Sequence, residues 1–125
     1  MSVKKTTADL GDDPLITFCR ALPATTEDVK WGDNLVFSVG KKMFAVFDLP
    51  EARRCSFQSH PLTFDTLTGR DSIVPAPYLA RHHWVMVEER ACLPEEMLQE
   101  LIQDSYRLVA AKLPKKLQRE LGLEA

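Results

Sequence analysis

The stretch Leu35-Val36-Phe37-Ser38-Val39-Gly40-Lys41-Lys42-Met43-Phe44-Ala45-Val46-Phe47-Asp48-Leu49 decides the fold. Two runs of β-branched and aromatic residues flank Gly40-Lys41. This pattern is typical of a β-hairpin with a type II′ turn, because glycine takes the positive φ of the first central position. Phe37 then faces Phe44 and Leu35 faces Val46, all on one face, because strand side chains alternate. The other face carries Val36, Ser38, Met43, Ala45 and Phe47. It is too apolar to face open water, so it is either partly covered by other elements or a binding surface.

Length and composition indicate one ordinary globular domain. The chain has 125 residues and a net charge of −2, so binding to nucleic acid would need local basic patches. No apolar run is long enough for a membrane span, and the N-terminus lacks the apolar core of a signal peptide. The three cysteines, Cys19, Cys55 and Cys92, form no zinc or CxxC spacing, which favours buried thiols in a reducing cytoplasm. We expect a cytoplasmic protein; the sequence does not determine the oligomeric state, for which a monomer is the default.

Helices are expected at both ends of the chain. Asp13-Pro14 begins the first helix and Pro23 ends it. After Pro94, apolar residues recur at helical spacing as far as Pro114. The other expected elements are strands at Val29–Trp31, Cys55–Gln58 and His83–Glu88, an extended segment at Ile73–Tyr78, and short helices at Pro61–Thr68 and Lys115–Leu121. The fold is therefore α+β, an antiparallel β-meander sheet with the terminal helices packed on one face. It forms a single domain, residues 13–122, after a flexible tail, residues 1–12.

Basic residues are the first candidates for a site. They occur at the expected hairpin tip, at the next connection and at the start of a strand, and are Lys41, Lys42, Arg53, Arg54 and Arg81. A basic tip can contact phosphates as a wing does, and each contact adds salt dependence. The alternative is a solubilising turn, with the C-terminal basic cluster, Lys112 to Arg119, as a solvated helix face.

Aromatic residues are the second candidates. Trp31, Trp84 and Tyr106 are large side chains whose polar tips need partners. They either pack in the core or form a ligand-binding face on the sheet.

No catalytic, metal or cofactor site is expected. His82 and His83 are adjacent, so on a strand they point to opposite faces and cannot bind one ion together. The sequence offers no nucleophile–base pair and no glycine-rich phosphate loop. We therefore expect a protein that is not an enzyme.

Several motifs occur in an order that resembles the MmcQ/YjbR family. They are Glu27-Asp28-Val29-Lys30-Trp31-Gly32-Asp33, Leu35-Val36-Phe37-Ser38-Val39, Lys42-Met43-Phe44-Ala45, Ile73-Val74-Pro75-Ala76-Pro77-Tyr78 with His83-Trp84-Val85, Ser105-Tyr106-Arg107-Leu108-Val109, and Leu113-Pro114-Lys115-Lys116. The resemblance runs from about Leu15 to Leu121. It implies a CyaY/frataxin-like α+β fold and a double-wing arrangement like the DNA-binding domain of the phage transcription factor MotA. Iron binding is not implied, because residues 14–22 contain no Asp or Glu.

Three functions follow as hypotheses. The first is a non-enzymatic DNA-binding protein that uses the five candidate cations. The second is a small-ligand or protein-interaction module that uses the sheet face around Trp31 and Trp84. The third is an enzyme with an unrecognised site, which a Cys or Ser brought next to a His would support.

Overall fold

The structure is a computed structural model that describes residues 13–49, 51–77 and 79–123. The elements in chain order are α1 (Pro14–Ala21), β1 (Thr25–Lys30), β2 (Asn34–Val39), β3 (Lys42–Asp48), β4 (Cys55–Gln58), α2 (Phe64–Thr68), β5 (Ile73–Pro75), η2 (Ala80–His82), β6 (Trp84–Val87), η3 (Arg90–Cys92), α3 (Glu95–Ala111) and α4 (Lys115–Glu120). The expected tail, residues 1–12, lies outside the described residues.

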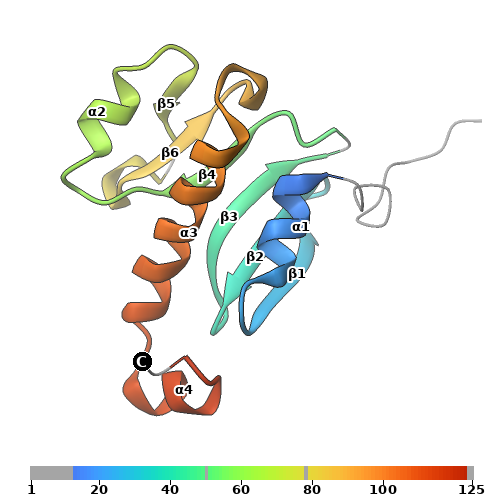
Figure 1. The fold of residues 1–125 in the computed structure, drawn as a ribbon, viewed down its shortest axis with the longest axis vertical. Coiled ribbons are helices and arrows are strands. Elements are labelled where there is room, and N and C mark those ends of the chain that lie inside the picture. Colours follow the sequence, from blue (N-terminus) through green and yellow to red (C-terminus); the bar gives the residue numbers. More distant parts are fainter. Residues whose placement is uncertain (1–12, 50, 78, 124–125) are drawn as a thin grey trace, which may run out of the picture.

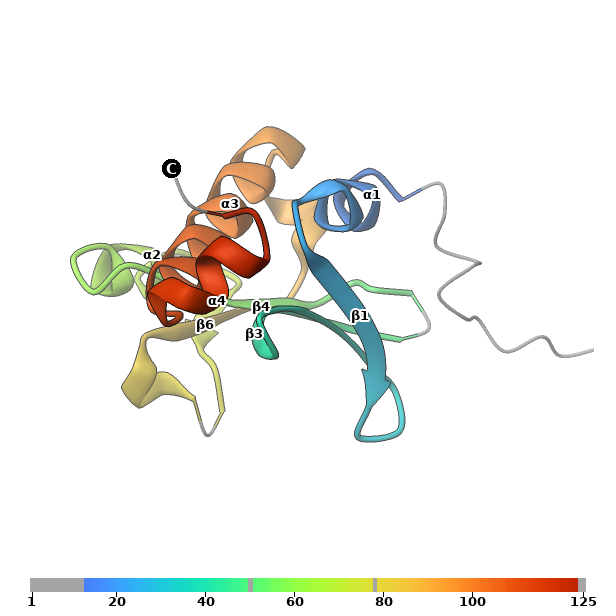
Figure 2. The ribbon, with the colours of Figure 1, turned by 90° about the horizontal axis from the view of Figure 1, so that it is seen from below.

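The α+β prediction is confirmed. Six antiparallel strands form one sheet in the order β1-β2-β3-β4-β6-β5, so the first four strands are a meander and β6 lies between β4 and β5. Figure 1 shows the long helix α3 crossing the sheet, with α1 beside it over β1 and β2. In Figure 2 the helices lie together on one side of the sheet, as expected for the terminal helices.

The core lies between this sheet face and the helices. Its largest members are fully buried phenylalanines from three strands, packed against the inward faces of α1 and α3. Phe37 makes an edge contact with Phe47, with ring centroids 5.9 Å apart, and Phe44 makes one with Tyr106 at 5.2 Å. The first contact joins the two strands of the hairpin, and the second holds α3 on it.

The central hairpin differs from the sequence prediction in its turn and its register. Gly40 and Lys41 both have positive φ, +58° and +68°, so the turn is type I′ rather than II′. A β-bulge shifts the pairing between Phe37 and Ser38, so Phe37 pairs with Ala45 instead of Phe44. Phe44 is the extra residue of the bulge.

The bulge also changes which residues of the hairpin face the core. Leu35 pairs with Phe47 instead of Val46, and both Ala45 and Phe47 belong to the core, whereas they were assigned to the opposite face. Phe37 and Phe44 still share the core face, with ring centroids 6.4 Å apart. A bulge allows this because its two residues oppose one residue of the partner strand.

The first strand is longer than expected. The sequence predicts a strand only at Val29–Trp31, but the strand runs from Thr25 to Lys30 and pairs with the whole of β2. β1 is the edge of the sheet and most of its residues are exposed, so its polar composition does not reveal a strand.

The first helix is fixed at its start by two sets of contacts. The Asp13 carboxylate caps α1 by accepting hydrogen bonds from the backbone N–H groups of Leu15 and Ile16, as predicted. It also accepts two hydrogen bonds from Arg90, both 2.9 Å long. Burial raises the pKa of the Asp13 carboxyl, but Arg90 and the two backbone donors more than offset this, so the pKa lies below its usual value.

Candidate functional site

The sheet opens between β3 and β4 at one end, and Ser105 fills the opening. The last pair between these strands is Ala45 with Phe57, so the next pair would be Phe44 with Gln58. There the Ser105 hydroxyl donates to the Phe44 carbonyl oxygen (2.7 Å) and accepts from the Gln58 backbone N–H (3.0 Å). Ser105 is fully buried. One hydroxyl therefore replaces a strand-to-strand hydrogen bond and lets the two halves of the sheet diverge.

A pocket of about 600 Å³ lies at this opening. The Gln58 side chain lines it and donates through Nε2 to the His82 carbonyl oxygen (2.9 Å). Trp84 lines the pocket and is only 5% exposed. The remaining lining residues are Lys42, Met43, Leu79, His82, Val109, Lys112, Leu113 and Pro114. The pocket thus has an apolar interior and lysines from two segments far apart in the sequence.

The hairpin turn is held beside the end of α3 by close packing. A Cβ atom placed on Gly40 would lie 2.6 Å from a methyl group of Leu113, so only glycine fits without movement. This contact fixes the position of the exposed lysines Lys41 and Lys42 next to Lys112.

Charge is distributed unequally along the molecule. We call the end made of residues 40–42, 79–83 and 112–120 the basic end; it contains seven Lys or Arg residues and one Glu. Figure 2 looks onto this end, with α4 and the β2–β3 turn close to each other and η2 set apart from α4, on the side of the sheet opposite the helices. We call residues 31–33, 51–54 and 88–96 at the other end of the strands the acidic end; it contains six Asp or Glu and three Arg. The net charge of −2 thus conceals two ends of opposite character.

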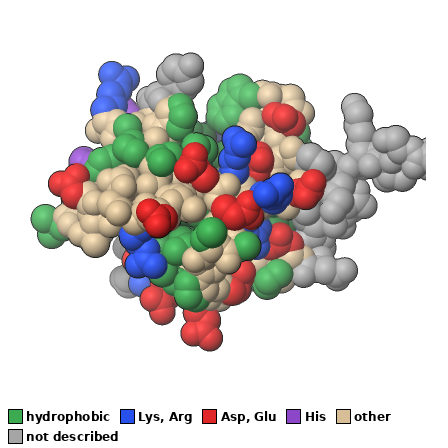
Figure 3. Space-filling view, turned by 90° about the horizontal axis from the view of Figure 1, so that it is seen from above, with side chains coloured by type: hydrophobic (Ala, Val, Ile, Leu, Met, Phe, Trp, Pro, Cys, Tyr) green, Lys and Arg blue, Asp and Glu red, His purple; other side chains and the backbone are tan. Residues whose placement is uncertain are grey.

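The five candidate cations do not form one surface. Lys41, Lys42 and Arg81 lie at the basic end, whereas Arg53 and Arg54 follow β3 at the acidic end. Arg53 forms an ion pair there with Glu89 (2.7 Å). Figure 3 shows this side of the molecule, where Lys and Arg side chains lie directly beside Asp and Glu side chains. The strands explain the separation, because alternate connections of a meander emerge at opposite ends.

The three candidate aromatic residues are also dispersed. Trp31 is 65% exposed in the β1–β2 turn at the acidic end, and Trp84 lies at the basic end. Tyr106 faces the core, and its hydroxyl donates to the Pro23 carbonyl oxygen (2.6 Å), which fastens α3 to the end of α1. Among the described large apolar residues only Val29, Trp31 and Leu62 are exposed. The open sheet face therefore offers no broad apolar patch around Trp31 and Trp84.

The cysteines and histidines form no catalytic arrangement in the part of the chain that the structure describes. Cys19 and Cys55 are buried, and burial raises the pKa of both thiols, that of Cys55 to about 12. Cys92 was expected to be buried but is exposed in η3. The same described residues contain no group of three or more His, Cys, Asp or Glu placed to hold a metal ion. None of their helices combines the length and apolar character that a membrane crossing requires.

Gln58, Ser105 and Lys112 were not predicted as site residues. Ser105 carried a signal, since it is the one short polar residue in the apolar stripe of the last long helix. No sequence pattern points to Gln58 or Lys112, because they come together only where β4 and the end of α3 meet in the fold.

Comparison with known proteins agrees with this fold. The YjbR family model matches residues 20–108. The crystal structure of the Deinococcus radiodurans protein DR2400, a DUF419-domain protein, is similar with a TM-score of 0.79 and 33% sequence identity, over 96% of this chain and 90% of that one. A Pseudomonas syringae protein shares the fold at 22% identity and a TM-score of 0.60, over 74% of this chain and 93% of that one. No curated protein matches. Since the family model spans most of the chain, this protein belongs to the YjbR family.

Proposed function

We propose that this protein binds DNA through its basic end, without catalysing a reaction. The observation that supports the proposal is the separation of charge: the basic end gathers seven cations against one Glu in a chain of net charge −2. Lysine and arginine bind the DNA backbone by neutralising phosphates and releasing counterions. This surface retains Lys41, Lys42 and Arg81 of the predicted set and adds Lys112.

Two features favour phosphate contact at this end over a merely solubilising role. No ion pair engages the Lys41, Lys42, Arg81 or Lys112 side chains within the described parts of the chain. The packing of Gly40 on Leu113 holds the turn in place, so less conformational freedom is lost on binding. Arg53 and Arg54 are not part of the proposed surface, because acids surround them.

The proposal is tested by fluorescence anisotropy with a short DNA duplex at several salt concentrations. If four cations each neutralise one phosphate, log K should fall with log salt at a slope of about −3.6. Affinity would then fall roughly 150-fold between about 50 and 200 mM salt. The double variant Lys41→Gln/Lys42→Gln should bring the slope to about −1.8.

The matched control is Arg53→Gln/Arg54→Gln, which removes the same formal charge at the acidic end. It should leave the slope unchanged. No binding at micromolar protein in low salt would end the DNA hypothesis. Binding that ignores salt would end the phosphate mechanism, and equal effects of the two double variants would show that only total charge matters.

A further inference from the structure

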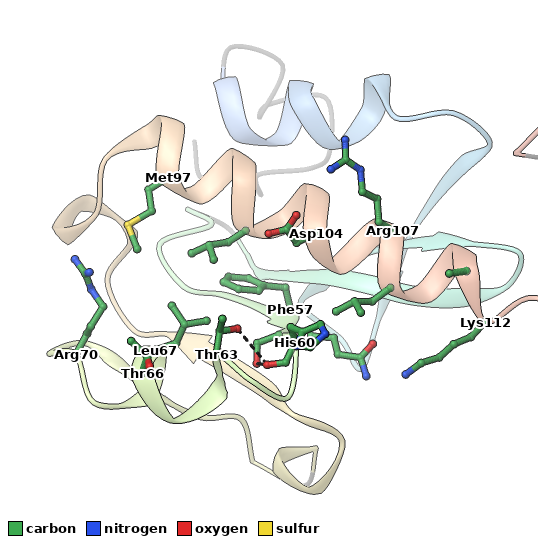
Figure 4. A pocket seen from close by; sticks show the side chains of 15 residues that line it. Phe57, His60, Thr63, Thr66, Leu67, Arg70, Met97, Asp104, Arg107 and Lys112 are labelled. Carbon is green, nitrogen blue, oxygen red and sulfur yellow. Dashed lines mark hydrogen bonds between the residues drawn. The ribbon is translucent and has the colours of Figure 1, made fainter. Parts of the chain in front are cut away.

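A larger pocket lies between α2 and α3, beside the opening of the sheet. Its volume is about 680 Å³, within the usual range for sites that hold a small organic molecule. Figure 4 shows it from close by, with α3 on one side and α2 on the other. The apolar wall consists of Phe57, Leu67, Met97, Leu101, Leu108 and Ala111. This lining favours a ligand with an apolar body.

The polar groups of the pocket are mostly cations or hydrogen-bond donors. Lys112 lies at one end and Arg70 at the other, near Met97 (Figure 4). Neither side chain has an ion-pair partner among the residues that the structure describes. His60 Nδ1 accepts a hydrogen bond from the Leu62 backbone N–H (3.1 Å), so a neutral ring carries its proton on Nε2 and keeps an N–H to donate. No acid therefore pairs with either of these two cations among the described residues.

The two remaining charged residues do not change this balance. The Arg107 side chain points away from α2 in Figure 4, so its stem rather than its guanidinium lines the pocket. Asp104 is exposed on α3, where water solvates its charge. It is the one acid among the lining residues, against three Lys or Arg.

We propose that this pocket binds a free organic acid with an apolar chain or ring and a single carboxylate. The carboxylate would lie at the end formed by Lys112 and His60, and the apolar body would extend along Leu101 and Leu108 towards Leu67. A neutral ligand would leave the cations unused, and a cationic ligand would be repelled by them. The inference does not depend on DNA binding.

The test is a titration with decanoate followed by amide chemical shifts, with decanol and decylamine as probes of equal chain length. Decanoate should bind saturably, shift residues of α2 and α3, and bind more tightly than either other probe. Lys112→Gln should weaken decanoate binding about two- to fivefold, the range expected of an exposed ion pair, and leave decanol unaffected. Lys116→Gln, an equal loss of charge outside the pocket, should leave both unaffected.

A second pair of variants tests the position of the apolar body. Ala111→Trp places an indole at the exposed edge of the pocket and should abolish decanoate binding. Ala91→Trp makes the same change at an exposed alanine outside this pocket and should leave decanoate binding unchanged. Circular dichroism checks that both variants fold. If Ala111→Trp does not fold, the comparison of Lys112→Gln with Lys116→Gln tests the proposal.

Three results would overturn the proposal. They are equal binding of the acid, alcohol and amine, shifts that avoid α2 and α3, and the same loss from Lys116→Gln as from Lys112→Gln. DNA is absent from the experiment, so its outcome is separate from that of the proposed function.

Discussion

Replacing Ser105 by alanine should destabilise the protein strongly, because one hydroxyl satisfies two buried backbone groups. The Phe44 carbonyl oxygen would lose its donor at 2.7 Å and the Gln58 N–H would lose its acceptor at 3.0 Å. Each unpaired buried group costs about 1–3 kcal/mol, so the two together should lower the free energy of unfolding by roughly 2–6 kcal/mol. At about 4 °C per kcal/mol for a domain of this size, Tm should fall by roughly 8–24 °C.

The measurement is urea unfolding at equilibrium, together with hydrogen exchange at the Gln58 amide. Exchange at Gln58 should become faster in Ser105→Ala, because that N–H loses the Ser105 hydroxyl as its hydrogen-bond acceptor. Ser56→Ala is the matched control, since Ser56 lies on the face of β4 opposite Phe57 and its hydroxyl forms no hydrogen bond with any other residue that the structure describes. A loss below about 0.5 kcal/mol in Ser105→Ala, which is typical of surface changes, would refute the bridging role.

Three further predictions concern the anchors of the fold and its exposed thiol. Because the pKa of Asp13 is lowered below 3.8, its pair with Arg90 stabilises the protein above that pH, and this contribution disappears in stronger acid. Arg90→Gln should therefore lower the free energy of unfolding more at neutral pH than well below pH 3.8. Urea unfolding at both pH values would measure this difference. Gly40→Ala should cost more than Gly32→Ala in the same assay, because both have positive φ but only Gly40 would clash with Leu113. A maleimide should react with Cys92 alone in the native protein and with all three thiols after unfolding, as mass spectrometry would measure.

The sequence predicted the parts of the fold that depend on local chemistry. Asp13-Pro14 is a strong helix start because a carboxylate can cap the first turn and proline needs no N–H there. The apolar runs on both sides of Gly40 predicted the hairpin and the burial of Phe37 and Phe44. They did not predict the bulge at Phe44, because one extra residue in a strand leaves the local composition unchanged.

The predictions of the edge strand and of the turn type were wrong for different reasons. The polar residues of Thr25–Lys30 form a strand because β2 supplies hydrogen bonds along their whole length, which is a tertiary effect. A Gly-X link suits a type II′ turn, but Lys41 also takes a positive φ here, at +68°. The packing of Gly40 against Leu113 couples this turn to a segment more than seventy positions away in the sequence.

The candidate site depends on which connections lie together at the same end of the strands. Amino-acid composition does not reveal this arrangement. Arg53 and Lys42 look alike in the sequence, but one follows β3 and the other begins it, so they lie at opposite ends of the sheet. The acids follow the same rule, because the connection after β6 joins those after β1 and β3 at the acidic end. A net charge of −2 therefore does not argue against binding a polyanion. The six residues of β2 span about 20 Å. A ligand that far from the acidic end is screened from it, since the Debye length is about 8 Å at physiological salt. What such a ligand encounters is the field of Lys42, Lys112 and their neighbours.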